Sequence, residues 1–291
     1  MTARLDDGQS AAAARPFAAL PRERLREVAG ILTDIDDTLT RDGVLEPAAR
    51  AALEALERAG IPVLAVTGRP MGWSEAFLRP GPGRWPLPAI VAENGAVALI
   101  RTRDGAGDHD RDGDALAIEY AQDAATRARH ARRLREVAAR VLAEVPGTTL
   151  ARDSAGRVTD IAIDHGEFAS LDAATVERVV ALMRAAGMTA TVSSIHVNGW
   201  FGEHSKWSGA RWIVERLFGR ALERETARWI YVGDSTNDQE MFARFALSVG
   251  VANLRRFAAE LEVWPAWITD GERGAGFAEV AAALLAARGV A

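Results

Sequence analysis

Short, almost wholly apolar runs alternate with helical patterns along most of this chain, and this alternation limits the folds open to it. The runs are residues 31–35, 61–66, 89–92, 229–232, 246–249 and 266–268. Helical patterns lie between them, and the one over 46–59 begins beside Pro47 and ends at Gly60. Strands that are apolar on both faces and separated by helices are typical of a buried parallel sheet. The sequence therefore predicts an α/β fold with a doubly wound, Rossmann-like parallel sheet core.

The pattern changes in the middle of the chain. Apolar and polar residues alternate over 158–163, as in a strand with one exposed face. A further strand is predicted over 189–197, with helices over 125–144 and 172–186. These elements indicate a smaller α+β domain inserted into the parallel core. The predicted organisation is a loosely ordered, Ala-rich tail (1–20), a core domain (21–100 and 201–291) and the inserted domain (101–200).

Composition excludes several classes of function. The chain has 291 residues, which suits one large domain or two modest ones. Its net charge of −5 gives no electrostatic reason to expect nucleic acid or an anionic membrane as a partner, and no apolar run approaches the roughly 20 residues that span a bilayer. Cysteine is absent, which rules out disulfides and thiolate catalysis, and the N-terminus lacks a secretory pattern. We therefore expect a cytoplasmic protein.

Polar residues collect where the predicted core strands end, and doubly wound sheets bind their ligands at that edge. The segments are 34–38 (DIDDT), 67–69 (TGR), 93–95 (ENG) and 233–238 (GDSTND). A single aspartate at a strand end is often only the cap of the next helix. Five aspartates shared between two strand ends are harder to explain in that way, because clustered carboxylates repel one another unless a cation lies among them. Ligands of this oxygen-only kind suit Mg²⁺.

These segments resemble the signature motifs of the haloacid dehalogenase (HAD) superfamily of phosphohydrolases. Residues 34–38 match the DxDxT motif, 67–69 match the second motif, and 233–238 match the fourth, GDxxND. Lys206 stands where the lysine of the third motif is expected. The resemblance covers about residues 30–280 and implies a HAD-like core. The first and fourth motifs, in this order and on strand ends, make the signal specific.

The resemblance gives Asp34 the role of nucleophile, which would form an aspartyl-phosphate. It makes Asp36 the general acid and then the general base. The metal site implied for Mg²⁺ comprises Asp34, the backbone carbonyl of Asp36, and Asp234. Asp238 would either support the metal shell or orient Lys206.

The same resemblance implies a site for the phosphoryl oxygens. Thr67, the amide of Gly68, and Lys206 would bind them. Asn237 would hydrogen-bond either the phosphate or Lys206. Arg69 would contact the substrate or brace its loop through Glu93. A plain structural reading of Lys206, as a solvated residue at a helix start, remains open from sequence alone.

The position of the inserted domain, after the third core strand, resembles the type-two cap of subclass IIB. That subclass contains the sucrose-phosphate and mannosyl-3-phosphoglycerate phosphatases. Asp37 departs from the pattern, because many relatives have glycine there. His196 could reach the substrate or face solvent, and Asn198-Gly199 could form a hairpin turn.

The function implied is a Mg²⁺-dependent phosphomonoester hydrolase (a phosphatase) that acts on a small phosphorylated metabolite, with a sugar phosphate as the leading class. One alternative is a phosphomutase similar to phosphomannomutase, which would return the phosphate to the same sugar. Another is a catalytically inactive binding protein on the same scaffold.

Overall fold

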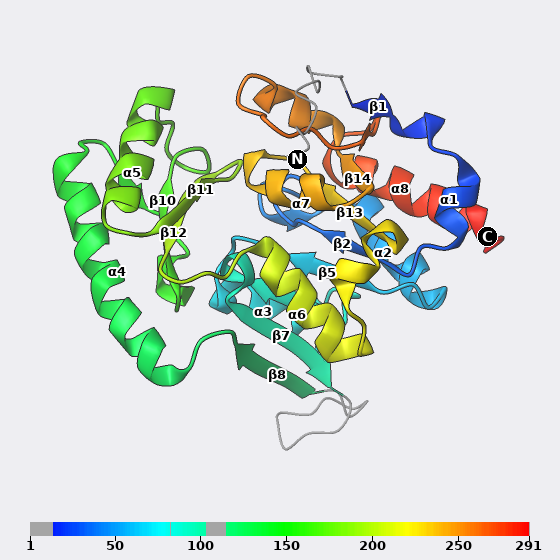
Figure 1. Ribbon diagram of the computed structural model, residues 1–291, viewed down its shortest axis with the longest axis horizontal. Coiled ribbons are helices and arrows are strands. Elements are labelled where there is room, and N and C mark those ends of the chain that lie inside the picture. The colour runs from blue at the N-terminus through cyan, green and yellow to red at the C-terminus, as the bar shows by residue number, and fades with distance from the viewer. Residues whose placement is uncertain (1–13, 82, 103–114, 291) are drawn as a thin grey trace, which may run out of the picture.

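The computed structural model describes residues 14–81, 83–102 and 115–290, and its central feature is a nine-stranded sheet (Figure 1). The strand order is β1-β15-β14-β13-β2-β5-β6-β7-β8. All neighbours from β1 to β6 are parallel, and β7 and β8 continue the sheet antiparallel. The strands are β1 (Arg15–Pro16), β2 (Gly30–Thr33), β5 (Val63–Val66), β6 (Ala89–Ala92), β7 (Val97–Thr102), β8 (Ala115–Tyr120), β13 (Trp229–Gly233), β14 (Leu247–Gly250) and β15 (Trp267–Ile268).

Helices cover both faces of this sheet. One face packs against α1 (Arg22–Arg26), α2 (Pro47–Arg58), α3 (Met71–Leu78) and α8 (Arg273–Ala287). The other face packs against α6 (Lys206–Phe218) and α7 (Gln239–Arg244). Every residue of β2, β5, β6 and β13 is buried, as the apolar runs predicted. The α/β class and the parallel, doubly wound core are confirmed.

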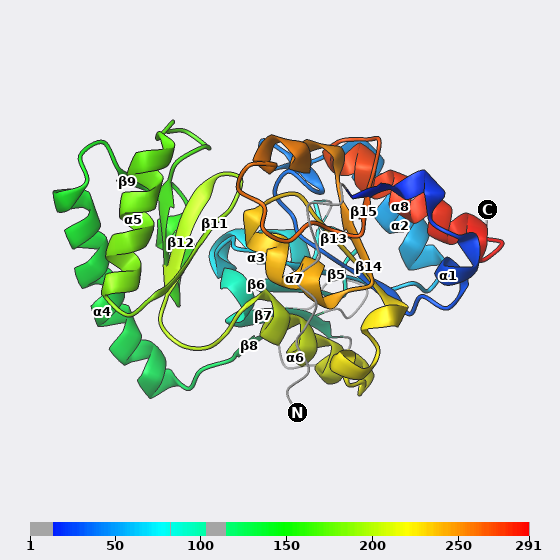
Figure 2. The same ribbon diagram turned by 45° about the horizontal axis from the view of Figure 1, so that its top comes forward.

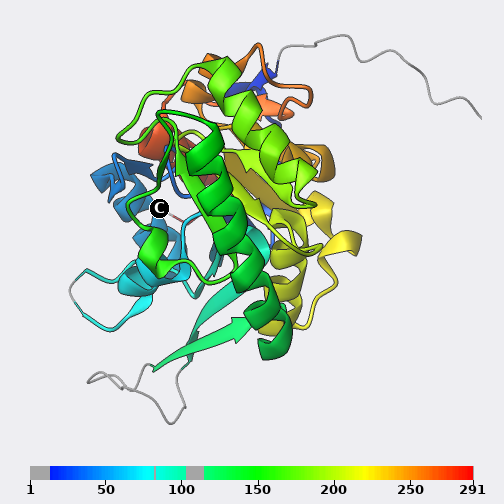
Figure 3. The same cartoon turned by 90° about the vertical axis from the view of Figure 1, so that its left-hand side faces the viewer.

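A second, four-stranded antiparallel sheet lies beside the first (Figures 1 and 2). Its order is β11-β12-β10-β9, and α4 and α5 pack on its outer side, away from the core (Figure 3). We refer to residues 124–200 as the cap unit. Its elements are α4 (Ala124–Glu144), β9 (Thr149–Leu150), β10 (Asp160–Asp164), α5 (Ala173–Ala185), β11 (Thr189–Val192) and β12 (His196–Trp200). A small β3–β4 ribbon (Thr40–Arg41, Val44–Leu45) follows β2.

Three sequence expectations need correction. The strand β8 pairs with β7 in the core sheet, so residues 115–120 do not belong with the cap unit, although 101–200 was expected to be one domain. The strand expected over 189–197 is two strands that turn at 193–195, which leaves Asn198 inside β12 rather than in a turn. Arg15–Pro16 pairs with β15, and Phe17 and Leu20 are buried, so 14–20 are not a loose tail; the rest of the expected tail lies outside the described residues.

Local sequence signals explain where the key helices begin. Pro47 is the first residue of α2, where its missing N–H costs nothing. The α4 and α5 helices begin after Asp123 and Asp172, whose side chains accept the N–H of Thr126 and Thr175. Ser205 and Ser208 form a capping box at the start of α6, so that Lys206 is its first residue. This capping box fixes the position of Lys206 relative to the sheet edge.

Candidate active site

Three neighbouring parallel strands, β13, β2 and β5, bring the predicted site residues to one edge of the sheet. The register pairs Thr33 with Val232 on one side and with Ala65 on the other. Asp34 comes directly after β2, and its N–H donates to the carbonyl of Val232 at 2.9 Å. Thr67 and Asp234 follow β5 and β13 in the same way. The motifs that are far apart in sequence therefore meet at the carboxyl ends of the strands.

Lys206 links the first and fourth motifs. Its Nζ donates to Oδ1 of Asp34 at 2.8 Å, to Oδ1 of Asp238 at 2.7 Å and to Oδ1 of Asn237 at 3.3 Å. Its side chain is only 3 % exposed, so this lysine is not a solvated residue at a helix start. Burial alone lowers the pKa of Lys206, but the charges of Asp238 and Asp34 raise it above its ordinary value. Lys206 is a fixed cation beside Asp34.

Asp238 is fully buried, and its carboxylate is occupied by protein donors. One oxygen accepts Lys206 and the hydroxyl of Tyr231. The other accepts the backbone N–H of Asp234 at 2.9 Å and of Ser235 at 3.1 Å. Two roles were expected for Asp238, to orient Lys206 or to support the metal shell. These bonds favour the first.

We use the name carboxylate floor for Asp34, Asp234, Asp238 and Lys206. Oxygens of the three aspartates lie within 4.8 Å of one another. Burial raises the pKa of Asp34 to about 7, against the effect of Lys206, and the charges of Asp238 and Asp36 add to the rise. Burial and the charge of Asp34 raise the pKa of Asp234 well above its ordinary value. These buried carboxylates carry more negative charge than Lys206 compensates, which is the environment that fits a divalent cation.

Asp234 is the carboxylate that would gain most from a bound cation, because it has no exposed surface and two of its three side-chain contacts are long. Its oxygens accept from Thr38 Oγ1 at 3.5 Å, Asn253 Nδ2 at 3.4 Å and Arg256 Nη2 at 3.2 Å. Hydrogen bonds of ordinary strength are shorter than the first two. The oxygens of Asp34 and Asp234 therefore have acceptor capacity that a small, hard cation such as Mg²⁺ could use.

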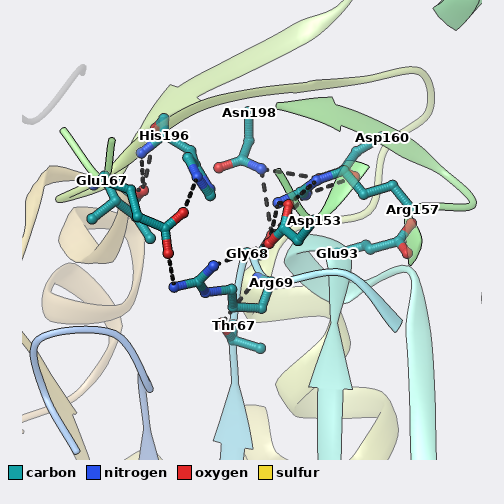
Figure 4. A network of polar contacts seen from close by, with 12 residues as sticks. Thr67, Gly68, Arg69, Glu93, Asp153, Arg157, Asp160, Glu167, His196 and Asn198 are labelled. Atoms are coloured by element: carbon teal, nitrogen blue, oxygen red, sulfur yellow. Dashed lines mark hydrogen bonds and ion pairs between the residues drawn. The ribbon is translucent and has the colours of Figure 1, made fainter. Parts of the chain in front are cut away.

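Asp36 is held differently from the carboxylate floor. Nε and Nη2 of Arg69 each donate to its carboxylate, at distances of 2.9 to 3.0 Å. The same guanidinium reaches the cap unit, where Nη1 donates to Asp153 at 3.1 Å and Nη2 to Glu167 at 2.8 Å (Figure 4). Glu167 also contacts Nε2 of His196 at 3.0 Å, and Arg69 and His196 contribute to a pKa of about 2 for Glu167 although burial opposes it. Arg69 therefore joins Asp36 to the cap unit.

Glu93 contacts the loop of Arg69, as one of the two expectations for Arg69 required: its N–H donates to the carbonyl of Arg69 at 2.9 Å. Its carboxylate accepts the backbone N–H groups of Met71, Val158 and Thr159, at 2.6 to 3.1 Å. Two of these donors belong to the cap unit. Glu93 is thus a second link between core and cap.

The phosphate-binding loop expected at Thr67 and Gly68 is held by the cap unit. The peptide that joins Gly68 to Arg69 donates its N–H to Oγ1 of Thr67 at 3.0 Å. Its carbonyl accepts Nη1 of Arg157 at 3.0 Å and Nδ2 of Asn198 at 3.4 Å (Figure 4). A Cβ at Gly68 would lie 3.3 Å from the Asn198 amide oxygen, so this close approach favours glycine. Among the described residues, the hydroxyl of Thr67 accepts this bond and donates none, so it could donate to a ligand.

Arg157 and Asp160 complete these contacts inside the cap unit. The guanidinium of Arg157 donates to Asp160 at 2.9 Å and to Asp153 at 3.1 Å, and its side chain is 2 % exposed. Burial raises the pKa of Asp160 to about 7, and Arg157 opposes that rise. We call the set of Arg69, Glu93, Asp153, Arg157, Asp160 and Glu167 the junction network.

A cavity of about 410 Å³ opens between the core and the cap unit. Asp36 and Arg69 lie in its wall with Arg256 and Arg273 on the core side, and Glu167 and Phe168 line it from the cap unit. Phe168 is 57 % exposed, although it is a large apolar residue. The predicted acid, Asp36, therefore faces a space that a small molecule could enter.

The structure brings together all the predicted site residues, and it adds several that the sequence reading missed. Asn253 follows β14, so the same search for polar residues at strand ends would have found it. Tyr231 lies in β13, Arg256 near the end of a 3-10 helix (Ala252–Phe257) and Arg273 at the start of α8, and no spacing rule pointed to any of them. The cap residues Arg157, Asp160 and Glu167 belong to no motif, so only the fold could reveal them.

Comparison with known proteins found a family model that matches part of the chain. Residues 31–108 match the family model of the haloacid dehalogenase-like hydrolases. No curated protein matches the sequence. No helix among the described residues is long and apolar enough to cross a membrane.

Solved structures share the fold at low sequence identity. A sucrose-phosphatase from Synechocystis, solved with sucrose and phosphate, is 13 % identical with a TM-score of 0.60, over 89 % of this chain and 98 % of that one. A protein of Thermoplasma acidophilum is 14 % identical with a TM-score of 0.62, over 88 % and 98 %. A subclass IIB sugar phosphatase is 14 % identical with a TM-score of 0.55, over 91 % and 100 %. Residues 31–108 are therefore similar to the haloacid dehalogenase-like hydrolases in sequence, and the described chain shares its fold with these solved structures.

Proposed function

We propose that this protein is a Mg²⁺-dependent phosphomonoester hydrolase that works through an aspartyl-phosphate on Asp34. The observation that carries the proposal is the buried pair of Asp34 and Lys206, 2.8 Å apart, among carboxylates that lack enough positive charge. A nucleophile, a cation for the phosphoryl group, and ligands for a metal are thereby gathered at one edge of the sheet. The match to a hydrolase family agrees with this combination.

Asp34 would attack phosphorus with one carboxylate oxygen, and the P–O bond to the leaving group would break. Lys206 would bind the phosphoryl group of the substrate. Its ammonium lies 2.8 Å from the attacking carboxylate and would offset the negative charge that develops on the phosphoryl oxygens. Asp238 keeps the ammonium there through its 2.7 Å bond to Nζ. Asn237 contacts the same ammonium at 3.3 Å, which favours support of Lys206 over direct phosphate binding.

The metal would be held by the carboxylates of Asp34 and Asp234 and by the backbone carbonyl of Asp36. When bound, Mg²⁺ would neutralise charge and polarise a phosphoryl oxygen. The raised pKa values of Asp34 and Asp234 support this assignment, because both carboxylates would ionise readily beside a cation. Thr67 and the Gly68 amide would bind the remaining phosphoryl oxygens, and the cap unit fixes the peptide that orients Thr67.

Asp36 would protonate the leaving oxygen and then take a proton from the attacking water. Its carboxylate lies 2.9 Å from Nε of Arg69, so it must leave this contact before it can donate to the leaving oxygen. For the first step Asp36 must carry a proton. We therefore propose that the leaving group separates Asp36 from Arg69 as it enters the cavity between them.

The substrate would be a small phosphorylated metabolite, and a sugar phosphate is the leading class. Two of the structures that share the fold are, by their names, a sucrose-phosphatase and a sugar phosphatase. The polar residues that line the cavity suit a leaving group with hydroxyls. The cytoplasmic location stays a prediction of the sequence.

A panel of phosphate esters, assayed for phosphate release with Mg²⁺ and with EDTA, tests this function. We expect metal-dependent turnover of at least one small ester. Release of free phosphate at enzymatic rates argues against the phosphomutase. If no ester is turned over although Mg²⁺ binds, the inactive binding protein is the better account.

A further inference from the structure

A tyrosine hydroxyl is buried beside the carboxylate floor. Tyr231 lies in β13 with no exposed surface, and its hydroxyl donates to Oδ1 of Asp238. Its ring packs against Phe242 and Phe245, with ring centroids 5.9 Å away in both cases. A phenylalanine would fill this apolar position without a polar atom that needs a partner. The packing therefore explains the ring, and among the described residues only Asp238 explains the hydroxyl.

A carboxylate has about four lone-pair sites, and protein donors fill them all on Asp238. Its Oδ2 accepts the N–H groups of Asp234 and Ser235. Its Oδ1 accepts Nζ of Lys206 at 2.7 Å and the hydroxyl of Tyr231. Burial and the charge of Asp238 raise the pKa of Tyr231 well above its ordinary value, so the hydroxyl keeps its proton and acts as a donor. The four donors leave Asp238 without a free site.

Lys206 shares one oxygen of Asp238 with Tyr231. An ammonium has three N–H donors. Those of this lysine are directed to Asp34 at 2.8 Å, to Asp238 at 2.7 Å and to Asn237 at 3.3 Å. The ammonium must therefore loosen one of these contacts to bind a phosphoryl oxygen. Because two donors compete for the same oxygen, the bond from Tyr231 limits how tightly Asp238 holds Lys206.

We propose that Tyr231 is a positioning residue for the reaction, whose hydroxyl saturates Asp238 and so keeps the Lys206 ammonium available to the phosphoryl group. This inference rests on the proposed phosphatase function and adds to it a residue outside the four sequence motifs. Tyr231 would touch neither the substrate nor the metal, and it would act on the reaction through Asp238 and Lys206.

Tyr231→Phe removes the hydroxyl and keeps the ring. We expect kcat to fall about tenfold to a hundredfold, as for one lost hydrogen bond to a charged group, with little change in KM or in the Mg²⁺ concentration for half-maximal activity. The matched control is Tyr120→Phe, the other tyrosine of the chain, whose hydroxyl contacts Sδ of Met71 at 3.3 Å. It should keep its kcat. An unchanged kcat for Tyr231→Phe would overturn the inference and leave the phosphatase function intact.

The composition of the chain allows Lys206 to be observed directly. It is the only lysine in the sequence, so protein that contains lysine isotope-labelled at Nζ gives one lysine ammonium signal by NMR. In the absence of any ester, this signal should move in Tyr231→Phe and stay in place in Tyr120→Phe. A shift would support the link even if the wild-type protein released no phosphate. An unmoved signal would count against the link whatever the activity.

Fluorotyrosine separates hydrogen-bond donation from packing. It keeps the hydroxyl and makes it a stronger donor, and in the Tyr120→Phe background Tyr231 is the only position that takes it up. We expect the Lys206 signal to move in the direction opposite to that in Tyr231→Phe, with kcat retained. Movement in the same direction, together with a lower kcat, would show that the shape of the ring decides the effect and would contradict the inference.

Discussion

The carboxylate floor and the junction network are both buried clusters of charged side chains, but their carboxylates receive different hydrogen-bond donors. In the junction network, Asp160 accepts hydrogen bonds from the guanidinium of Arg157, and Glu93 accepts them from the backbone N–H groups of Val158 and Thr159. On the floor, Asp34 has Lys206 as its one short side-chain partner among the described residues, and Asp234 accepts from Arg256 at 3.2 Å and from Asn253 at 3.4 Å. Donors from both core and cap satisfy the junction, whereas the three aspartates of the floor share one buried cation, Lys206, and Asp234 also contacts the more exposed Arg256.

The two regions therefore depend on different partners. The junction network is stabilised by the position of the cap unit, so its failure should appear as lost stability and altered substrate binding. The pKa is raised to about 7 for both Asp34 on the floor and Asp160 in the junction, but Asp160 has Arg157 and Asn198 as donors, so a response to added metal is expected at the floor. Substitutions in the two regions should therefore have different consequences.

The largest effect is expected at the nucleophile. Asp34→Asn should lower kcat by about 10⁴-fold or more, because the amide oxygen cannot replace the carboxylate as nucleophile. The fold should be retained, since the substitution removes a buried charge without changing size. Asp270→Asn, at an exposed position, is the control and should keep its activity. A kcat for Asp34→Asn close to wild type would refute the assigned role.

Lys206→Met should have the largest effect on stability. The change leaves Asp34 and Asp238 buried without their shared cation, which typically costs about 3–5 kcal/mol of unfolding free energy. Urea unfolding measures this loss. Added Mg²⁺ should restore part of it, because the floor lacks positive charge. A variant as stable as wild type without metal would contradict our account of the floor.

Arg157→Met should destabilise by a smaller amount, about 3 kcal/mol, because Asn198 still donates to Asp160. Mg²⁺ should not restore this loss, in contrast with Lys206→Met. Arg132→Met, an exposed position on α4, serves as the control and should lie near zero. Rescue of Arg157→Met by Mg²⁺ would show that the two regions are not separate.

The smallest effect concerns pH. Burial raises the pKa of Asp34 from 3.8 to about 7, so the folded protein binds this proton more tightly than the unfolded chain does. The stability from this proton is complete below about pH 4 and is lost as pH rises through about 7. Mg²⁺ replaces the proton, so the rise in Tm on adding Mg²⁺ should be larger at about pH 8 than at about pH 5.5. An equal rise at both values would count against a metal site at Asp34.

The sequence predicted the floor well because its residues follow strands with an unmistakable pattern. Asp34 and Asp234 end fully apolar strands, and the parallel sheet then brings them together. The junction network was not predictable in this way. Its partners depend on how the cap unit meets the core, and Arg157 or Glu167 in sequence looks like any charged residue of a loop. The boundary of the cap unit was misplaced for a related reason, since the β7–β8 pairing is set by tertiary contacts.

Trapping of the phosphorylated intermediate would distinguish Asp34 from any other nucleophile. Turnover of a good ester in the presence of Mg²⁺ would be quenched in acid, and the digested protein would be analysed by mass spectrometry. We predict that one phosphoryl group is found on the peptide that contains Asp34, that hydroxylamine removes it, and that it is absent from Asp34→Asn. Rapid phosphate release with no phosphoryl group on that peptide, or with one on another residue, would contradict the account.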